Sequence, residues 1–166
     1  MISVLYSCTE GYFPYLVRSL ETVPDKMNLE IIIVVDFGLK LKCEEILKKR
    51  GLMQRKDIKI IEVSTKMPNM KRAYCLNLAA QNAHYEYILI SDADYLYPKC
   101  LWEFLLNNIP EDERVVYHFF IGKLNKKVSS KILCGEYKWS EIYEKYEGML
   151  VFFSSFFSGE NITKAC

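Results

Sequence analysis

The sequence has little of what marks membrane-spanning, disulfide-linked or nucleic-acid-binding proteins. No apolar run approaches the roughly 20 residues that a membrane-spanning helix needs. The six cysteines are scattered and form no Cys-x-x-Cys pair, a pattern that favours mostly buried free thiols in a reducing compartment. The formal net charge is only +1, so nothing indicates a nucleic-acid-binding surface.

We also expect neither a secretory leader nor a glycine-rich phosphate loop. Met1 leads directly into an apolar, strand-like run, so we expect a cytoplasmic protein. A sugar nucleotidyltransferase would need several glycines after the first strand, and only Gly11 is there. No repeat, low-complexity tract or linker interrupts the 166 residues, which we expect to form a single domain, 1–166.

Strand-like and helix-like patterns alternate along the first hundred residues. Strands are expected over 2–6, 30–35, 58–63 and 87–90, and amphipathic helices over 14–23, 39–47 and 69–83. This β-α-β-α-β-α-β order predicts an α/β fold with a mostly parallel central sheet flanked by helices.

A mixed C-terminal part should follow the parallel sheet. Its expected elements are a short helix from Pro98, strands over 115–121 and 149–153, and a helix over 140–146. The basic stretch 123–131 is expected to be a solvated loop. Near the end of the chain lie four phenylalanines that are too many to leave in water: Phe152, Phe153, Phe156 and Phe157. They would belong to the core, to a contact in a homo-oligomer, or to a peripheral contact with lipid headgroups.

Two carboxylates follow the fourth expected strand, at Asp92 and Asp94. Residues i and i+2 of an extended segment project to the same side, so both carboxylates can serve one cation. Oxygen ligands suit Mg²⁺ or Mn²⁺, ions that usually complete their coordination with substrate phosphates. The plainer alternative is a solvated, Asp-rich turn after a strand.

Other polar residues are expected beside this pair, because ligands of α/β sheets bind beyond the carboxyl ends of the strands. Ser7 and Thr9 follow the first strand, and Asp36 follows the second. Lys71 and Arg72 lie at the start of the third helix, where free N–H groups and the helix dipole favour an anion. The pair is either a phosphate contact or ordinary solvated surface.

These residues resemble the GT-A-fold glycosyltransferases. Arg72-Ala73-Tyr74-Cys75-Leu76-Asn77 followed by Ser91-Asp92-Ala93-Asp94 matches the β-galactosyltransferase type. The spacing of Asn77, Ala83, Glu86-Tyr87-Ile88 and Asp92-Ala93-Asp94 is similar to that of family-2-type members. The likeness covers residues 1 to about 100, with Phe37 standing where family members have a second Asp.

The resemblance implies a GT-A, Rossmann-like enzyme that moves a sugar from a nucleoside-diphosphate sugar to an unknown acceptor. Residues 1–100 would be the nucleotide-sugar-binding half and 101–166 a reduced acceptor half of a minimal or truncated member. A UDP-sugar is favoured as donor and a GDP-sugar is possible. The implied contacts to the donor are Ser7, Thr9, Asp36, Lys71, Arg72, Asn77 and Asp92.

Two further roles follow from the same resemblance. Asp92 and Asp94 would hold Mn²⁺ or Mg²⁺. Inverting members take their general base from a later acidic motif, and only Gly159-Glu160-Asn161 is similar to it, which makes Glu160 the candidate. Whether transfer inverts or retains the configuration stays open.

Two rival interpretations remain. A phosphotransferase of the haloacid dehalogenase type also carries Asp-x-Asp at a strand end, but on its first strand, whereas here the motif follows the fourth. The other alternative is a non-catalytic GT-A-like domain that binds a nucleotide or a protein.

Overall fold

The structure of the chain, a computed structural model, describes residues 1–25, 28–66, 72–108, 121–136 and 150–152. Its contacts divide the chain into two compact units, Met1–Ala93 and Asp94–Cys166. Each unit is described by itself below. Within the described ranges, no helix is both long and apolar enough to cross a membrane.

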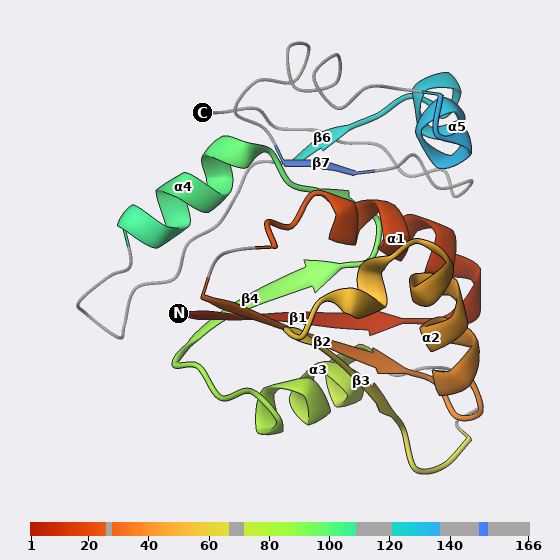
Figure 1. The fold of residues 1–166 in the computed structure, drawn as a ribbon, viewed down its shortest axis with the longest axis vertical. Helices are drawn as coiled ribbons and strands as arrows, with labels where there is room; N and C mark the ends of the chain where they lie inside the picture. Colours follow the sequence, from red (N-terminus) through yellow and green to blue (C-terminus); the bar gives the residue numbers. More distant parts are fainter. Residues whose placement is uncertain (26–27, 67–71, 109–120, 137–149, 153–166) are drawn as a thin grey trace. The chain divides into compact units, whose positions relative to one another are not determined.

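The first unit is built on a parallel sheet, as the alternating pattern predicts (Figure 1). Among the described residues its strands are β1 (Ile2–Cys8), β2 (Leu29–Val35), β3 (Ile58–Glu62) and β4 (Tyr87–Asp92), in the order β3-β2-β1-β4. All three strand pairs are parallel. The connecting helices are α1 (Phe13–Glu21), α2 (Lys40–Lys49) and α3 (Arg72–Gln81), with short 3₁₀ turns at Glu10–Tyr12 and Leu52–Gln54. The expected mostly parallel sheet flanked by helices is confirmed.

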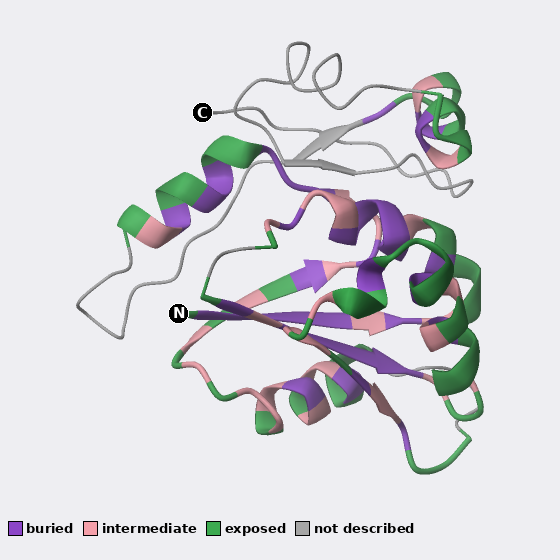
Figure 2. Cartoon of the chain, in the orientation of Figure 1, coloured by how far each residue is buried: buried purple, intermediate pink, exposed green. Residues whose placement is uncertain are grey.

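Helices cover both faces of this sheet. Neighbouring residues of a strand point to opposite faces. Leu5 of β1 lies in one buried cluster with Cys75 and Ala79 of α3. The next residue, Tyr6, places its hydroxyl 3.1 Å from Ser19 Oγ of α1, so α1 covers the other face. Figure 2 shows the resulting burial of the central strands. Residues 31–35 of β2 are all fully buried, which accounts for their unbroken apolar sequence.

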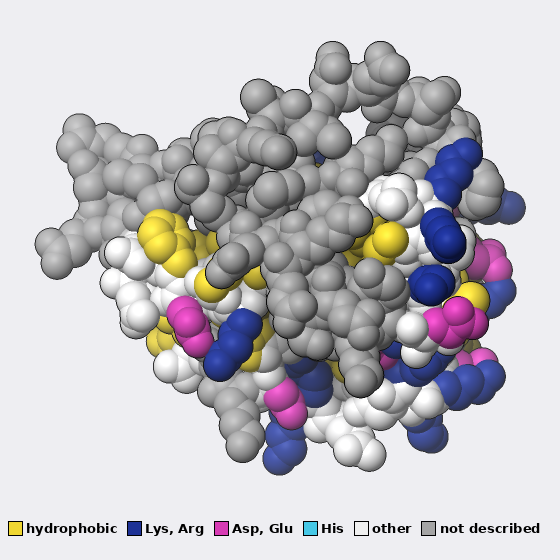
Figure 3. Space-filling view, turned by 90° about the horizontal axis from the view of Figure 1, so that it is seen from above, with side chains coloured by type: hydrophobic (Ala, Val, Ile, Leu, Met, Phe, Trp, Pro, Cys, Tyr) yellow, Lys and Arg dark blue, Asp and Glu magenta, His cyan; other side chains and the backbone are white. Residues whose placement is uncertain are grey.

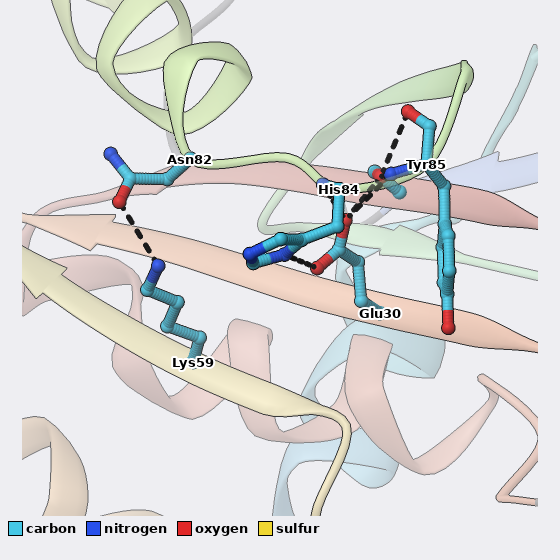
Figure 4. Close-up of polar contacts among 6 residues, drawn as sticks. Glu30, Lys59, Asn82, His84 and Tyr85 are labelled. Carbon is cyan, nitrogen blue, oxygen red and sulfur yellow. Dashed lines mark hydrogen bonds and ion pairs between the residues drawn. The ribbon is translucent and has the colours of Figure 1, made fainter.

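A polar cluster fastens the turn between α3 and β4 to the amino-terminal ends of β1 and β2 (Figure 4). Ser3 Oγ donates to Glu30 Oε1 at 2.6 Å, and His84 Nδ1 lies 2.8 Å from Glu30 Oε2. The backbone N–H of Tyr85 donates to Glu30 Oε1 at 3.2 Å. Burial alone would raise the pKa of Glu30, but the hydrogen bonds from Ser3, His84 and Tyr85 outweigh it, and the pKa lies below its ordinary value.

The second unit contains β5 (Tyr95–Leu96), α4 (Lys99–Asn107), β6 (Ile121–Lys123), α5 (Lys126–Cys134) and β7 (Leu150–Phe152). The strands are ordered β5-β7-β6, with β5 antiparallel and β6 parallel to β7. The expected helix after Pro98 and the expected strand around 149–153 are both present as α4 and β7. The expected helix over 140–146 and most of the expected strand over 115–121 lie outside the described residues.

The prediction of a solvated loop over 123–131 is wrong, because α5 begins at Lys126. Asn125 caps this helix by accepting a hydrogen bond from the Val128 N–H at 2.9 Å. Ile132 is buried, and Gly135 ends the helix with φ 80°, a left-handed conformation that glycine adopts easily. The cap, the buried apolar residue and the glycine stop mark this helix, and its lysines are compatible with it because lysine has a high helix propensity.

The Glu30 cluster generates the first prediction. Glu30→Gln should lower the free energy of unfolding near neutral pH by about 1–3 kcal/mol, because a charged acceptor of several hydrogen bonds becomes neutral. Since the pKa of Glu30 lies below its ordinary 4.5, its contribution is present above that pH and is lost as pH falls through the lowered value. Urea unfolding of the parent and the variant across this range measures the difference.

Glu86→Gln is the matched control, because Glu86 is exposed and lies two residues beyond His84. It should leave the unfolding curve close to that of the parent. A Glu30→Gln variant as stable as this control at neutral pH would show that the cluster contributes nothing.

Candidate functional site

The carboxyl ends of the parallel strands bring the expected strand-end residues to one edge of the first unit. In the register between β1 and β4, Ser7 pairs directly with Asp92. In the register between β1 and β2, Cys8 pairs with Val35, so Thr9 and Asp36 each follow one residue beyond that pair. Ser7, Thr9, Asp36 and Asp92 therefore share this edge, and all four are partly exposed.

Arg72 at the start of α3 forms an ion pair with Asp92 at the end of β4. Its Nε donates to Asp92 Oδ1 at 2.9 Å, and one terminal guanidinium nitrogen lies 2.7 Å from the same oxygen. The side chains are 56% and 36% exposed, so the pair contributes little to stability, typically about 0–1 kcal/mol. Both contacts use Oδ1, so Arg72 orients the Asp92 carboxylate.

Asp36 is held in a tight turn between β2 and α2. Its Oδ1 accepts the N–H of Phe37 at 2.8 Å, and its carbonyl oxygen accepts the N–H of Leu39 at 3.1 Å. Burial raises the pKa of the Cys75 thiol on α3, and the negative charge of Asp36 adds to that rise. Asp36 therefore lies near the first turn of α3, the same turn that presents Arg72.

Asn77 lies elsewhere on α3. It follows the buried Cys75 by two residues, which is about 200° around a helix, and its side chain is exposed. The contact of Asn77 with a donor stays a prediction. Lys71 and Glu160 lie outside the described residues, as do Phe153, Phe156 and Phe157.

Asp92 near the end of the first unit and Asp94 at the start of the second each have the chemistry of a ligand for a hard cation, and a metal ion shared by the two stays a prediction. Asp92 and Asp94 are both partly exposed and offer only oxygen atoms, the ligands that Mg²⁺ and Mn²⁺ prefer. Across the described part of the chain, no group of three or more His, Cys, Asp or Glu side chains is arranged to hold a metal ion by itself. A pair of carboxylates suits an ion whose other ligands are phosphates and water.

Charges of both signs surround this region of the first unit. Lys42 of α2 pairs with Glu10 of the turn after Thr9. On the described part of the face seen in Figure 3, Lys and Arg side chains are interspersed with Asp and Glu and form no single basic field. Attraction of an anionic ligand would therefore depend on individual groups such as Arg72.

Glu62 is a further strand-end acid at this edge and is absent from the set expected from the sequence. It is the last residue of β3 and pairs with Val35 in the sheet register. Its Oε2 accepts the backbone N–H of Lys40 at 2.9 Å, at the start of α2. The rule that identifies Asp36 and Asp92, a polar residue directly after an apolar strand, does not identify Glu62, because Glu62 lies inside the expected strand 58–63 and Val63 follows it.

Three solved structures are similar to this chain. TarS 1-349 of S. aureus matches with a TM-score of 0.60 and 19% identity, over 75% of this chain and 36% of that one. The mannosyltransferase PcManGT from Pyrobaculum calidifontis, in complex with GDP-Man and Mn²⁺, matches with a TM-score of 0.49 and 15% identity, over 80% and 37%. The galactosyltransferase LgtC, with donor and acceptor sugar analogs, matches with a TM-score of 0.44 and 11% identity, over 76% and 48%.

The first of these likenesses confirms the GT-A, Rossmann-like fold expected from the sequence. The chain spans about a third of the length of the first two structures. Among curated protein sequences, none matches this chain significantly. The sequence pattern of the family described as Glycosyl transferase family 2 matches residues 3–159, nearly the whole chain, and the protein belongs to that family.

Proposed function

We propose that this protein transfers a sugar from a nucleoside-diphosphate sugar to an acceptor, with a divalent metal ion bound by Asp92 and Asp94. The observation that carries the proposal is the Arg72–Asp92 pair at the carboxyl edge of the parallel sheet, close to Asp36. Membership of glycosyl transferase family 2 supports the reaction class. A UDP-sugar is the favoured donor and a GDP-sugar the alternative.

Each group at the edge has a distinct task in this proposal. The turn that carries Asp36 would contact the nucleobase, and Ser7 and Thr9 would contact the ribose through their hydroxyl groups. Arg72 would donate charge-assisted hydrogen bonds to the diphosphate. Its ion pair with Asp92 is exposed and weak, so the guanidinium can turn toward a phosphate oxygen at little cost in stability.

The metal ion would be held by Asp92 and Asp94, and Mn²⁺ or Mg²⁺ fits their oxygen atoms. When bound, the ion supplies Lewis-acid stabilisation of the charge that develops on the departing nucleoside diphosphate. Arg72 acts on the same charge from the side of α3. In this proposal, sugar transfer depends on the positive charges of the metal ion and of Arg72, because the departing nucleoside diphosphate develops negative charge beside them.

The metal assignment predicts that Asp94→Asn removes Mn²⁺-dependent nucleotide binding while the fold remains intact. An amide oxygen is a much weaker ligand than a carboxylate and carries no charge for the cation. Calorimetric titration with UDP and with GDP, each with and without Mn²⁺, measures the effect, and far-ultraviolet circular dichroism checks the fold.

Asp25→Asn is the control for this variant, because Asp25 is 71% exposed and lies before β2, at the opposite end of the sheet. Asp25→Asn should show the same Mn²⁺-dependent binding of UDP and GDP as the parent protein. Retention of metal-dependent binding by Asp94→Asn would remove Asp94 from the site.

The proposed role of Arg72 predicts that its removal changes the affinity for a nucleoside diphosphate much more than the affinity for the corresponding nucleoside. Arg72→Ala should weaken binding of a nucleoside diphosphate by roughly 10-fold to 150-fold, the effect of losing a hydrogen bond to a charged group worth about 1.5–3 kcal/mol. Binding of the corresponding nucleoside should change little, because it has no phosphate. Arg50→Ala, at the exposed end of α2, is the control. Equal losses for both ligands would assign Arg72 to the fold instead.

The catalytic base is the last part of the proposal. If transfer inverts the configuration, a carboxylate must accept the proton of the acceptor hydroxyl. Asp92 and Asp94 are assigned to the metal and Asp36 to the nucleobase, which leaves Glu160, outside the described residues, as the candidate. Glu160→Gln should lose sugar transfer and keep donor binding, measured by product formation and by calorimetry on one preparation. Transfer at the parent rate would mean a different base or a retaining reaction.

A further inference from the structure

The turn between β2 and α2, residues Asp36–Lys40, is held by a carboxylate from a neighbouring strand. Gly38 has φ 79°, so the chain reverses sharply here. Leu39 occupies the cap position of α2 and provides no side-chain hydrogen bond to the helix. The first N–H groups of α2 therefore need an acceptor from elsewhere.

Glu62 is that acceptor. Its Oε2 receives the N–H of Lys40 at 2.9 Å. The backbone N–H groups of Gly38 and Lys40 hold the pKa of Glu62 below its ordinary value, because their stabilisation of the carboxylate exceeds the opposing effect of burial. Glu62 is therefore ionised at neutral pH, and its charge lies at the amino end of α2, where the helix dipole stabilises it.

The turn that Glu62 holds presents two groups to the edge of the sheet. Phe37 is 50% exposed, an unusual position for a large aromatic side chain. The Asp36 carboxylate is fixed beside it by the Phe37 N–H. The ion pair between Lys42 of α2 and Glu10 connects the same region to the turn that follows Thr9. An exposed aromatic ring next to a fixed acceptor can offer a nucleobase a stacking face and a hydrogen-bond partner.

We propose that Glu62 is a positioning residue for nucleobase recognition: it fixes the Asp36–Lys40 turn and thereby places the Phe37 ring and the Asp36 carboxylate against the base of the donor. The inference rests on the proposed function and adds how the base is recognised. It assigns no direct ligand contact to Glu62, whose carboxylate is engaged by the backbone of the turn.

The test compares ligands with and without a base. The parent, Glu62→Ala and Glu62→Gln are titrated with UDP, GDP and inorganic pyrophosphate, all with Mn²⁺. Glu62→Ala should bind its preferred nucleoside diphosphate roughly tenfold more weakly, the size expected when a charge-assisted hydrogen bond is lost. Its affinity for pyrophosphate should equal that of the parent. Glu62→Gln retains one neutral acceptor, so its affinity for the nucleoside diphosphate should fall less than that of Glu62→Ala.

Glu45→Ala is the matched control, because it removes an exposed carboxylate of α2 and should change neither affinity. Equal weakening of pyrophosphate and nucleotide would overturn the inference in favour of a general structural role, and so would unchanged nucleotide binding. If Glu62→Ala does not fold, the affinities of Glu62→Gln for nucleotide and for pyrophosphate decide whether Glu62 acts on base recognition. A parent that binds no nucleotide and no pyrophosphate would overturn the proposed function, and this inference with it.

Discussion

Parallel pairing of β1 with β2 and β4 determines where the proposed ligand contacts at the strand ends of the first unit lie. Because β1 is central, its register with both neighbours aligns the ends of three strands: Ser7 is level with Asp92, and Cys8 is level with Val35. The polar residues at or just beyond these ends therefore share one edge. The buried apolar residues of β1 and β2 hold this register, since a shift by one residue would turn their side chains to the opposite face. The site thus depends on the same packing that forms the core.

The three carboxylates at this edge, Asp92, Asp36 and Glu62, each accept a hydrogen bond from a neighbouring group. These contacts order the carboxylates before a ligand binds. Asp92 is oriented by Arg72, Asp36 by the Phe37 N–H, and Glu62 by the backbone at the start of α2. At the other end of the sheet, Glu30 fixes the turn between the helix that carries Arg72 and the strand that carries Asp92. Preorganised groups of this kind lose little freedom on binding, which favours both affinity and transition-state stabilisation.

Much of the first unit is predictable from sequence, because its signals are local and agree with one another. The apolar run of β2 and the stripe of α1 identify their elements directly, and the strand-end rule identifies Asp36 and Asp92. The Arg72–Asp92 ion pair is not readable from spacing, since it depends on how α3 packs against the sheet. The role of Glu62 is likewise not readable from the sequence, because it depends on how the turn between β2 and α2 packs beside the end of β3. The α5 error has a different cause: the lysine content of 123–131 obscured the Asn125 cap and the buried Ile132.

The central claim is that this edge binds a nucleoside diphosphate together with a divalent cation. The most direct measurement is calorimetric titration of the unaltered protein with UDP and with GDP, first with Mn²⁺ and then with a chelator. We expect at least one of the two nucleotides to bind in the presence of Mn²⁺, and we expect the chelator to abolish or greatly weaken that binding. Binding of equal strength under both conditions would contradict the metal assignment, and absence of binding under either condition would contradict the proposed site.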